Sequence, residues 1–331
     1  MKMPVGLYAI IESAFRAAQG WTVDAQRDAI AAMYARFSEI AEGNPHAWKC
    51  RGVAPADIRD ASARNAMQAF PYTKLHCSTW NVDQAAALIF CSAGKALALG
   101  IPRSQWIHPL ASTESNHMVP VSARDDLARC PGASLAGRAA LEAGDLHADD
   151  LDLVNLYSCF PVAVETYASE LGIDSSRDLT VTGGTPFAGG PYNNYVLQAT
   201  ARMVELLRAG PSCHGLVASV SGVLTKQGFG LWGREPGRNG FVHADVTDAV
   251  ARAARTREIV DRYQGDATVA RYTIFYEPSQ PPRGVVVVDL RDKRRAVAHT
   301  ENAELIATMQ SGEFCGMQVK FESGNTFTLM R

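Results

Sequence analysis

The sequence predicts a mixed α/β fold, because the spacing of apolar residues changes twice along the chain. Between about residues 73 and 233, short apolar runs that suit buried strands alternate with helical segments, a pattern typical of helices layered on a sheet. Helical spacing precedes this part, and a series of short strand patterns follows it. We therefore expect a helical segment at 1–72, a layered core at 73–233 and a β-rich module at 240–331.

Composition and charge exclude several classes of function. The chain has 331 residues, of which 47% are hydrophobic and 20% charged, which is typical of a globular protein with room for two domains. A net charge of −2 leaves no basic surplus for a nucleic-acid backbone, so we expect no nucleic-acid partner. No apolar run approaches the roughly 18 residues of a membrane span, and the first residues lack a signal-peptide core. We expect a cytoplasmic protein without a membrane span.

The cysteines and histidines do not form a recognisable metal site. There are seven cysteines, an odd number with no C-x-x-C pair, which indicates reduced thiols rather than a disulfide framework. The eight histidines are scattered and share no ligand spacing with the cysteines. We therefore expect no bound metal.

The first segment is predicted to be helical. Thr22 suits an N-cap, and it precedes an apolar face made by Ile30, Met33, Tyr34, Phe37 and Ile40. A shorter helix is predicted from Pro55 through Met67, because alanine-rich sequence follows a proline that suits a first helical turn. The segment shows no sheet pattern of its own, so we expect it to pack on the core.

The core is predicted to alternate between strands and helices. The predicted strands are Ala85–Cys91, Trp106–Ala111, Asp152–Tyr157 and Gly215–Ser221. The predicted helices are Ala93–Leu99, Ala133–Ala143, Val162–Leu171 and Tyr195–Leu207. A glycine directly follows each of the first three helices, which is the usual residue at a helix C-terminus.

The last part is predicted to be a small β-barrel or sandwich. Asp245 could cap a helix that runs to Tyr263, since apolar residues share one face of that stretch. Five short strands are predicted after it, at Val269–Tyr276, Gly284–Leu290, Arg295–Thr300, Gly316–Glu322 and Thr326–Met330.

A glycine-rich run at 181–195 lies directly before the helix that begins at Tyr195. Glycines let the backbone approach a ligand or another segment closely, and a helix N-terminus offers free N–H groups to an anion. The run matches neither the G-x-G-x-x-G nor the G-x-x-x-x-G-K-[ST] nucleotide fingerprint. It predicts either tight packing or a ligand contact.

Two further runs follow predicted strands. Tyr157-Ser-Cys-Phe-Pro161 begins where a strand gives way to a helix, a common place for sites in α/β sheets. Cys159 there is either a nucleophile or a small buried hydrophobic residue. Ser219-Val-Ser-Gly222 either lines a pocket or forms a turn. His117 suits an acid or base by residue type, and a hydrogen-bonded loop histidine is the alternative.

In their order along the chain, these runs resemble the carboxyl half of a thiolase, in particular of the thiolase-like proteins related to the sterol-carrier thiolases. Residues 81–92 resemble the N-D-G-A-A-A strand that opens the second core half. Residues 157–160 fall where the family carries N-E-A-F or H-D-C-F, and 183–191 where it carries G-G-x-x-x-x-G-H-P. Residues 215–222 fall on the strand that ends in C-x-G. The tail is similar to the additional C-terminal domain of the type-1 thiolase-like proteins.

The resemblance implies a fold and a ligand. The fold is a thiolase-like layered α-β-α core half with a helical loop-domain segment before it and a small β-rich module after it. The resemblance also implies that a coenzyme A ester is bound, either as substrate or as ligand, without a resident cofactor. The substrate-binding positions fall on Tyr157, Ser158, Phe160, Gly183, Gly184, Gly189, Gly190, Ser219, Ser221 and Gly222.

The sequence departs from the family where the chemistry occurs. Gly190 stands at the position of the His that activates the nucleophile, Val220 at that of the second Cys, and Tyr157 at that of the oxyanion Asn or His. The nucleophile belongs to the family's amino-terminal half, for which we find no counterpart in this sequence. Because a glycine cannot accept a proton and a valine cannot deliver one, we expect no ordinary thiolase chemistry.

Three functions are compatible with these observations. The family suggests an acetyl-CoA acetyltransferase-like acyltransferase of lipid metabolism. The lost catalytic residues favour instead a protein that binds acyl-CoA or a lipid-like small molecule. Because a lone core half leaves an apolar face uncovered, the third interpretation is a structural subunit, completed by a partner chain with the thiolase amino-terminal half. A gene fragment is the remaining alternative.

Overall fold

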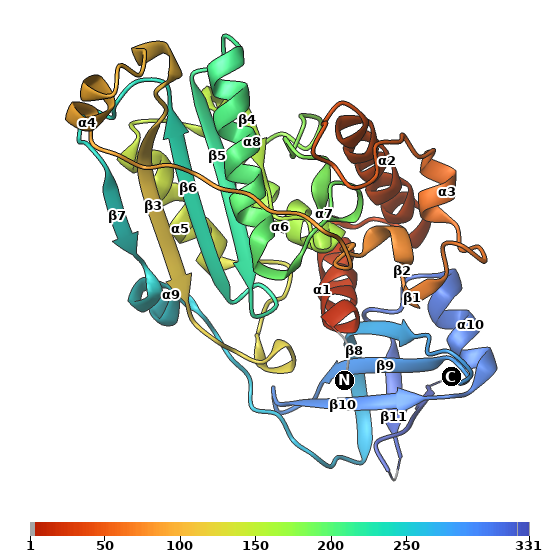
Figure 1. The fold of residues 1–331 in the computed structure, drawn as a ribbon. Helices are drawn as coiled ribbons and strands as arrows, with labels where there is room; N and C mark the ends of the chain where they lie inside the picture. The colour runs from red at the N-terminus through yellow and green to blue at the C-terminus, as the bar shows by residue number, and fades with distance from the viewer. Residues whose placement is uncertain (1–3, 323, 331) are drawn as a thin grey trace.

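The computed structural model describes residues 4–322 and 324–330, and it confirms the predicted mixed α/β fold (Figure 1). Within these residues the chain forms two sheets, with helices packed on and between them. A five-stranded sheet belongs to the middle of the chain. A seven-stranded sheet combines the C-terminal strands with a short hairpin at 67–73.

Helix α2 (Val23–Glu42) forms as the sequence predicts. It begins after Thr22, whose side-chain oxygen accepts a hydrogen bond from the Ala25 amide at 3.1 Å. Most of its predicted apolar face is buried: Tyr34 and Phe37 lose nearly all of their accessible surface, whereas Ile40 is half-buried. Local capping and periodicity therefore account for this helix.

The next helix is shorter than predicted. α3 (Pro55–Arg59) ends well before Met67, because the backbone becomes extended at Asp60. A hairpin then follows, made of β1 (Met67–Ala69) and β2 (Tyr72–Thr73). Ala69 of this hairpin lies opposite Phe275 of the C-terminal sheet, so strands from the two ends of the chain share one sheet.

Helix α1 (Pro4–Gln19) lies between the helical layer and the seven-stranded sheet (Figure 1). It packs on β8 (Gly265–Phe275) and on α6 (Pro161–Leu171). The Ser13 hydroxyl accepts a hydrogen bond from the Tyr272 amide at 3.0 Å. This contact attaches the helix directly to the backbone of a central strand.

The five-stranded sheet has the order β4-β5-β6-β3-β7. Its strands are β3 (His108–Asn116), β4 (Leu153–Asn155), β5 (His214–Ser221), β6 (Lys226–Gly233) and β7 (Val242–Asp245). β3, β4 and β5 form near their predicted positions. β6 and β7 were not predicted, because glycines interrupt the apolar pattern of β6 and β7 has only four residues.

Helices cover both faces of this sheet (Figure 1). α5 (Pro131–Ala143) packs on β3 and β6, and α8 (Tyr195–Ala209) packs on β5 from the opposite face. Both helices, together with α6, form where the sequence predicts them. α6 ends at Gly172, which adopts a left-handed conformation with φ 69°.

The strand predicted at Ala85–Cys91 is wrong. This segment belongs to no helix or strand and crosses in front of the five-stranded sheet (Figure 1). Ile89 is 95% exposed, whereas Phe90 contacts the Trp232 ring of β6 at 6.1 Å between centroids. The physical reason is pairing: β5 and β3 already flank β6, and β7 pairs with the other edge of β3. The run crosses the face of the sheet, where no strand edge is open to it, instead of extending the sheet at the outer edge of β4 or β7. The following helix, α4 (Ala93–Ala98), does form.

The five strands predicted for the C-terminal part are confirmed. Besides β8, they are β9 (Arg283–Asp289), β10 (Arg295–Thr300), β11 (Gln318–Phe321) and β12 (Phe327–Leu329). The helix predicted to reach Tyr263 is wrong beyond Ala253, the last residue of α9 (Thr247–Ala253). The Val260 amide instead donates to the Arg295 carbonyl at 2.8 Å, which holds this stretch against β10. α10 (Ala303–Ser311) was not predicted.

Candidate functional site

The glycine-rich loop is organised by the end of strand β4. The Asn155 side-chain oxygen accepts hydrogen bonds from the Val181 amide at 3.1 Å and from the Thr180 hydroxyl at 3.0 Å. The Thr180 hydroxyl in turn accepts from the Gly183 and Gly184 amides, at 3.2 and 3.1 Å. The single-turn helix α7 (Gly184–Phe187) follows directly. The loop is therefore fixed by buried side-chain to backbone hydrogen bonds.

The loop packs directly on helix α2. A Cβ atom placed on Gly183 would lie 2.4 Å from the Cβ of Ala41, and one on Gly184 would lie 2.7 Å from the Phe37 ring. A Cβ on Gly189 would lie 2.2 Å from Oε1 of Gln84. All four glycines of the loop, including Gly190, are buried. In this structure they serve close packing of backbone against neighbouring side chains.

The run 157–160 meets this loop at Ser158. The Ser158 hydroxyl accepts a hydrogen bond from the Thr185 amide at 2.9 Å, and the Thr185 hydroxyl donates to the Ser158 carbonyl at 2.7 Å. Tyr34 of α2 donates to the same carbonyl at 3.2 Å. Ser158 is fully buried, so its hydroxyl holds the two runs together.

The two aromatic residues of the run pack against other rings. Tyr157 contacts Tyr195 edge to face, with 5.3 Å between ring centroids, and burial raises the pKa of its hydroxyl. Phe160 lies 4.5 Å from Tyr8 and 5.8 Å from Tyr72 between centroids. These rings join the loop region to helices α1 and α8.

Cys159 carries a neutral thiol in this structure. Burial raises the pKa of its thiol to about 12, and the hydrogen bond with Tyr8 only partly opposes this rise. The thiolate is the nucleophilic form of cysteine, so Cys159 is unreactive at neutral pH here. It packs as a small, half-buried apolar residue, close to the alternative that the sequence offers.

The run 219–222 occupies the β5–β6 hairpin. The Ser219 carbonyl accepts a hydrogen bond from the Tyr167 hydroxyl at 3.0 Å, and the Gly222 carbonyl accepts from the Thr225 hydroxyl at 2.6 Å. Ser221 is exposed. The positive φ of Gly222, 57°, is the geometry of a tight turn. These residues contact the hairpin and α6 rather than the glycine-rich loop.

His117 lies at a different cavity, of about 270 Å³, beside the N-terminus of α5. Its amide donates to the Thr225 carbonyl at 3.1 Å. Cys130, Arg124 and Gln227 line the same cavity. The structure therefore separates His117 from the loop and from Cys159.

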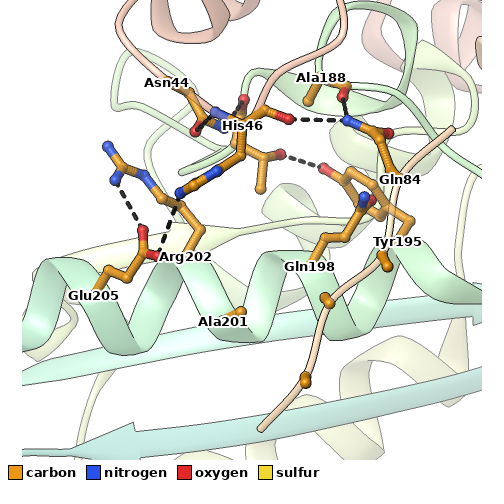
Figure 2. Close-up of a pocket in the computed structure, with 13 residues that line it drawn as sticks. Asn44, His46, Gln84, Ala188, Tyr195, Gln198, Ala201, Arg202 and Glu205 are labelled. Atoms are coloured by element: carbon orange, nitrogen blue, oxygen red, sulfur yellow. Dashed lines mark hydrogen bonds and ion pairs between the residues drawn. The ribbon is translucent and has the colours of Figure 1, made fainter. Parts of the chain in front are cut away.

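A cavity of about 380 Å³ opens beside the glycine-rich loop (Figure 2). Its lining consists of polar side chains from three segments and a wall of small apolar residues: Asn44, His46, Gln84, Ala85, Ala86, Ala87, Thr182, Ala188, Tyr195, Gln198, Ala201, Arg202 and Glu205. The sequence analysis did not single out the polar side chains of this lining outside the glycine-rich run, which are Asn44, His46, Gln84, Gln198, Arg202 and Glu205. The available signal was the spacing of Gln198, Arg202 and Glu205 on one face of the predicted helix.

Hydrogen bonds hold the walls of this cavity in place (Figure 2). The Gln84 side-chain amide donates to the Ala188 carbonyl at 2.8 Å and to the His46 carbonyl at 2.9 Å. On the opposite wall, Glu205 lies 3.1 Å from the Arg202 guanidinium and 3.4 Å from His46 Nε2. The cavity thus presents a guanidinium and an imidazole beside one exposed carboxylate. Such groups suit binding of an anionic or polar ligand rather than nucleophilic attack.

Two further observations, on metal ligands and on membrane-spanning helices, apply to the residues that the structure describes. Across 4–322 and 324–330, no group of three or more His, Cys, Asp or Glu side chains is arranged to hold a metal ion. Over the same ranges, every helix is too short or too polar to cross a membrane.

Replacing Gly183 with alanine should destabilise the fold more than the same change at Gly172. Both residues have positive φ, but a Cβ at Gly183 overlaps Ala41 at 2.4 Å, whereas a Cβ at Gly172 meets nothing within 4 Å. We expect Gly172→Ala to lower the free energy of unfolding by about 1 kcal/mol and Gly183→Ala by about 3 kcal/mol. Urea unfolding of both variants measures this. Equal losses would show that the loop does not depend on close approach to α2.

Cys159 should resist alkylation in the native protein. With a thiol pKa of about 12, only about one molecule in 10,000 carries the thiolate at pH 8, whereas Cys50, Cys91 and Cys213 are exposed. Treatment with iodoacetamide at pH 8, followed by peptide mass spectrometry, should label the exposed cysteines first. Labelling in urea is the control that the Cys159 peptide is detected. Modification of Cys159 as fast as Cys213 would contradict a neutral thiol at Cys159.

The comparisons with known proteins agree with this geometry. Residues 245–326 match the family described as the thiolase-like protein type 1 additional C-terminal domain. The crystal structure of a monomeric SCP2-thiolase-like protein type 1 from Mycobacterium smegmatis superposes with a TM-score of 0.88 and 27% identity. That match covers 100% of this chain and 74% of the M. smegmatis chain. No protein of curated function matches the sequence significantly.

Two more distant structures share the fold alone. The Ltp2-ChsH2(DUF35) aldolase matches with 19% identity and a TM-score of 0.56, over 71% of this chain and 64% of that chain. The human mitochondrial 3-ketoacyl-CoA thiolase matches with 15% identity and a TM-score of 0.51, over 68% and 59%. The family match over residues 245–326 and the similarity to the M. smegmatis structure support a thiolase-like protein with an additional C-terminal domain.

Proposed function

We propose that the protein binds an acyl-CoA or a related thioester at the cavity beside the glycine-rich loop, without catalysing thiolysis or condensation. The observation that carries this proposal is the pairing of a polar, partly cationic cavity with a neighbouring loop that has lost its catalytic side chains. The seven cysteines of the protein are all free, which favours a reducing compartment. We therefore also propose a cytoplasmic location.

The chemistry of the cavity supports an anionic ligand. Arg202 can exchange its ion pair with Glu205 for a phosphate, to which a guanidinium donates two parallel hydrogen bonds. His46 and Gln198 add polar contacts, and Ala85–Ala87 supply an apolar wall. A volume of about 380 Å³ accommodates part of a coenzyme A ester, with the remainder outside the cavity.

The loop argues against catalysis. Gly190 carries no group that could accept a proton, and its amide donates to the Thr79 carbonyl at 2.9 Å. The nearest thiol candidate, Cys159, stays protonated at neutral pH because its pKa is about 12. A thiolase needs both an activated thiolate and a base.

Calorimetry with acetyl-CoA and decanoyl-CoA tests the proposal. We expect saturable binding by the full chain, weakened about tenfold by Arg202→Gln, because one charge-assisted contact is lost. Arg208→Gln is the matched control, since Arg208 lies on the same helix but donates to the Gln105 carbonyl away from the cavity. Absence of binding, or equal loss in both variants, would reject the site. Turnover of acetoacetyl-CoA by the purified chain would reject the non-catalytic role.

A second candidate is a subunit that requires a partner chain with a thiolase amino-terminal half. The observation in its favour is a set of exposed apolar residues in the segment Ala85–Cys91, which crosses the sheet, and in or directly after the helix that follows it. They are Ile89, Phe90, Leu97 and Leu99, at 95, 65, 54 and 61% exposure. The aldolase named above is itself described by two components, Ltp2 and ChsH2. The double variant Ile89→Ser/Phe90→Ser distinguishes this subunit role from acyl-CoA binding. It should abolish the complex with the partner chain, measured by light scattering, while the affinity for acetyl-CoA stays unchanged.

A further inference from the structure

The cavity that contains His117 lies where three parts of the chain meet. Its walls come from the segment 117–132, which ends in the first turn of α5, from the β5–β6 hairpin and from α9 with the residues after it. It shares no lining residue with the cavity beside the glycine-rich loop, so it is independent of the proposed acyl-CoA site. Much of its wall is apolar, formed by Val119, Pro131, Leu224, Val250, Ala253 and Ala254.

Arg124 is a half-buried cation on the wall of this cavity. Its Nε donates to the Val119 carbonyl at 3.1 Å, and its Nη2 donates to the Val223 carbonyl at 2.6 Å. Both acceptors are neutral, and within the described ranges no carboxylate forms an ion pair with the guanidinium. Nη1 has no hydrogen-bond partner in the same residues and is not enclosed by protein, so it stays accessible. The guanidinium therefore has an open donor and an uncompensated charge.

The other charges around the cavity do not cancel that of Arg124. Two ion pairs neutralise most of them, and these pairs join Asp125 to Arg257 and Arg129 to Glu170. The wall then keeps Arg124 and the exposed Arg255 against one exposed carboxylate, that of Asp126. The N-terminus of α5, a helix of 13 residues, adds the positive end of its dipole. The remaining charge of the cavity is positive.

The position of Arg124 is fixed by structure on two sides. Val223 and Leu224 have φ of 56° and 61°, which is unfavourable for branched side chains, and Nη2 of Arg124 donates to the carbonyl between them. On the other side, Arg295 of β10 donates to the carbonyls of Arg124 and Asp125. A strained hairpin and the C-terminal sheet thus hold the guanidinium in place, and such preorganisation favours ligand binding.

We propose that this cavity binds a small apolar carboxylate, whose charged group accepts from Nη1 of Arg124 and whose body packs against α9 and the β5–β6 hairpin. A hydrogen bond between charged groups is stronger than one between neutral groups, and it also compensates the half-buried cation. An amine is disfavoured by the same charge. A cavity of roughly 150 Å³ is enough for benzene, so one of about 270 Å³ has room for a ligand such as benzoate.

Three probes with one ring test the head-group preference: benzoate, benzyl alcohol and benzylamine. Each is titrated into the full chain up to about 20 mM at constant ionic strength, and binding is followed by ligand-detected NMR. We expect benzoate to bind at least about tenfold more tightly than benzyl alcohol, and benzylamine not to bind. Absence of benzoate binding, or an amine that binds as well as benzoate, would overturn the proposal.

Matched variants locate the carboxylate. Ala253 and Ala251 are both exposed on α9, but only Ala253 lines the cavity. Ala253→Phe should abolish benzoate binding, and Ala251→Phe should leave it unchanged. Arg202→Gln, at the cavity beside the glycine-rich loop, should also leave it unchanged. Unchanged benzoate binding in Ala253→Phe, or loss of binding in Arg202→Gln, would place the anion elsewhere and overturn the proposal.

Arg124→Gln tests the charge itself. The variant should lose the preference for benzoate over benzyl alcohol, with folding monitored by circular dichroism. A folded variant that keeps the preference would overturn the role of the guanidinium, and if the variant does not fold, the Ala253 and Ala251 variants decide. Ala253→Phe should bind acetyl-CoA as the parent does, so failure of this proposal and failure of the acyl-CoA proposal are measured separately.

Discussion

The rest of the structure depends on the buried polar face of helix α1. Arg16 is fully buried, and its guanidinium makes two hydrogen bonds to Glu313, at 2.9 and 3.0 Å, while it lies 5.1 Å from the ring centroid of Tyr272. An unpaired charge at such a position is very unfavourable, so the helix accepts one orientation only. That orientation places one side of α1 on β8 and the other on α6. The N-terminal helix thereby connects the layered core to the C-terminal sheet.

Features with a local cause were predictable from the sequence, and features with a distant cause were not. The Thr22 cap and the left-handed Gly172 at the end of α6 each depend on a few neighbouring residues, and both form as expected. The hairpin at 67–73 joins a sheet whose other strands lie some 200 residues away, roughly one domain length. Its sequence carries no sign of that partner. Strand pairing across such separations is set by the assembled fold rather than by the pattern of a segment.

The candidate site divides in the same way. Tyr157–Phe160 follows strand β4, and the glycine-rich loop lies beside it because Asn155, at the end of β4, binds Thr180 and Val181 and because Ser158 binds Thr185. The cavity next to them is built from His46, Gln84 and the polar face of α8, which come from three segments with unrelated spacing. Glycine composition alone did not distinguish a ligand contact from packing. The close approach of Gly183 to Ala41 distinguishes the two, and it shows that Gly183 serves packing.

The segment Ala85–Cys91, which crosses the face of the sheet, also affects how the protein aggregates. Ala85–Cys91 is seven residues long, contains no charge, proline or glycine, and includes the strongly β-prone Ile89 and Phe90. Its backbone joins no ladder in the folded chain, so it can pair edge to edge with the same segment of another molecule without prior unfolding. The exposed charges of Asp83 and Lys95 flank the run as gatekeepers. Cross-β assembly from the native state is therefore the aggregation route that this architecture leaves open at high protein concentration.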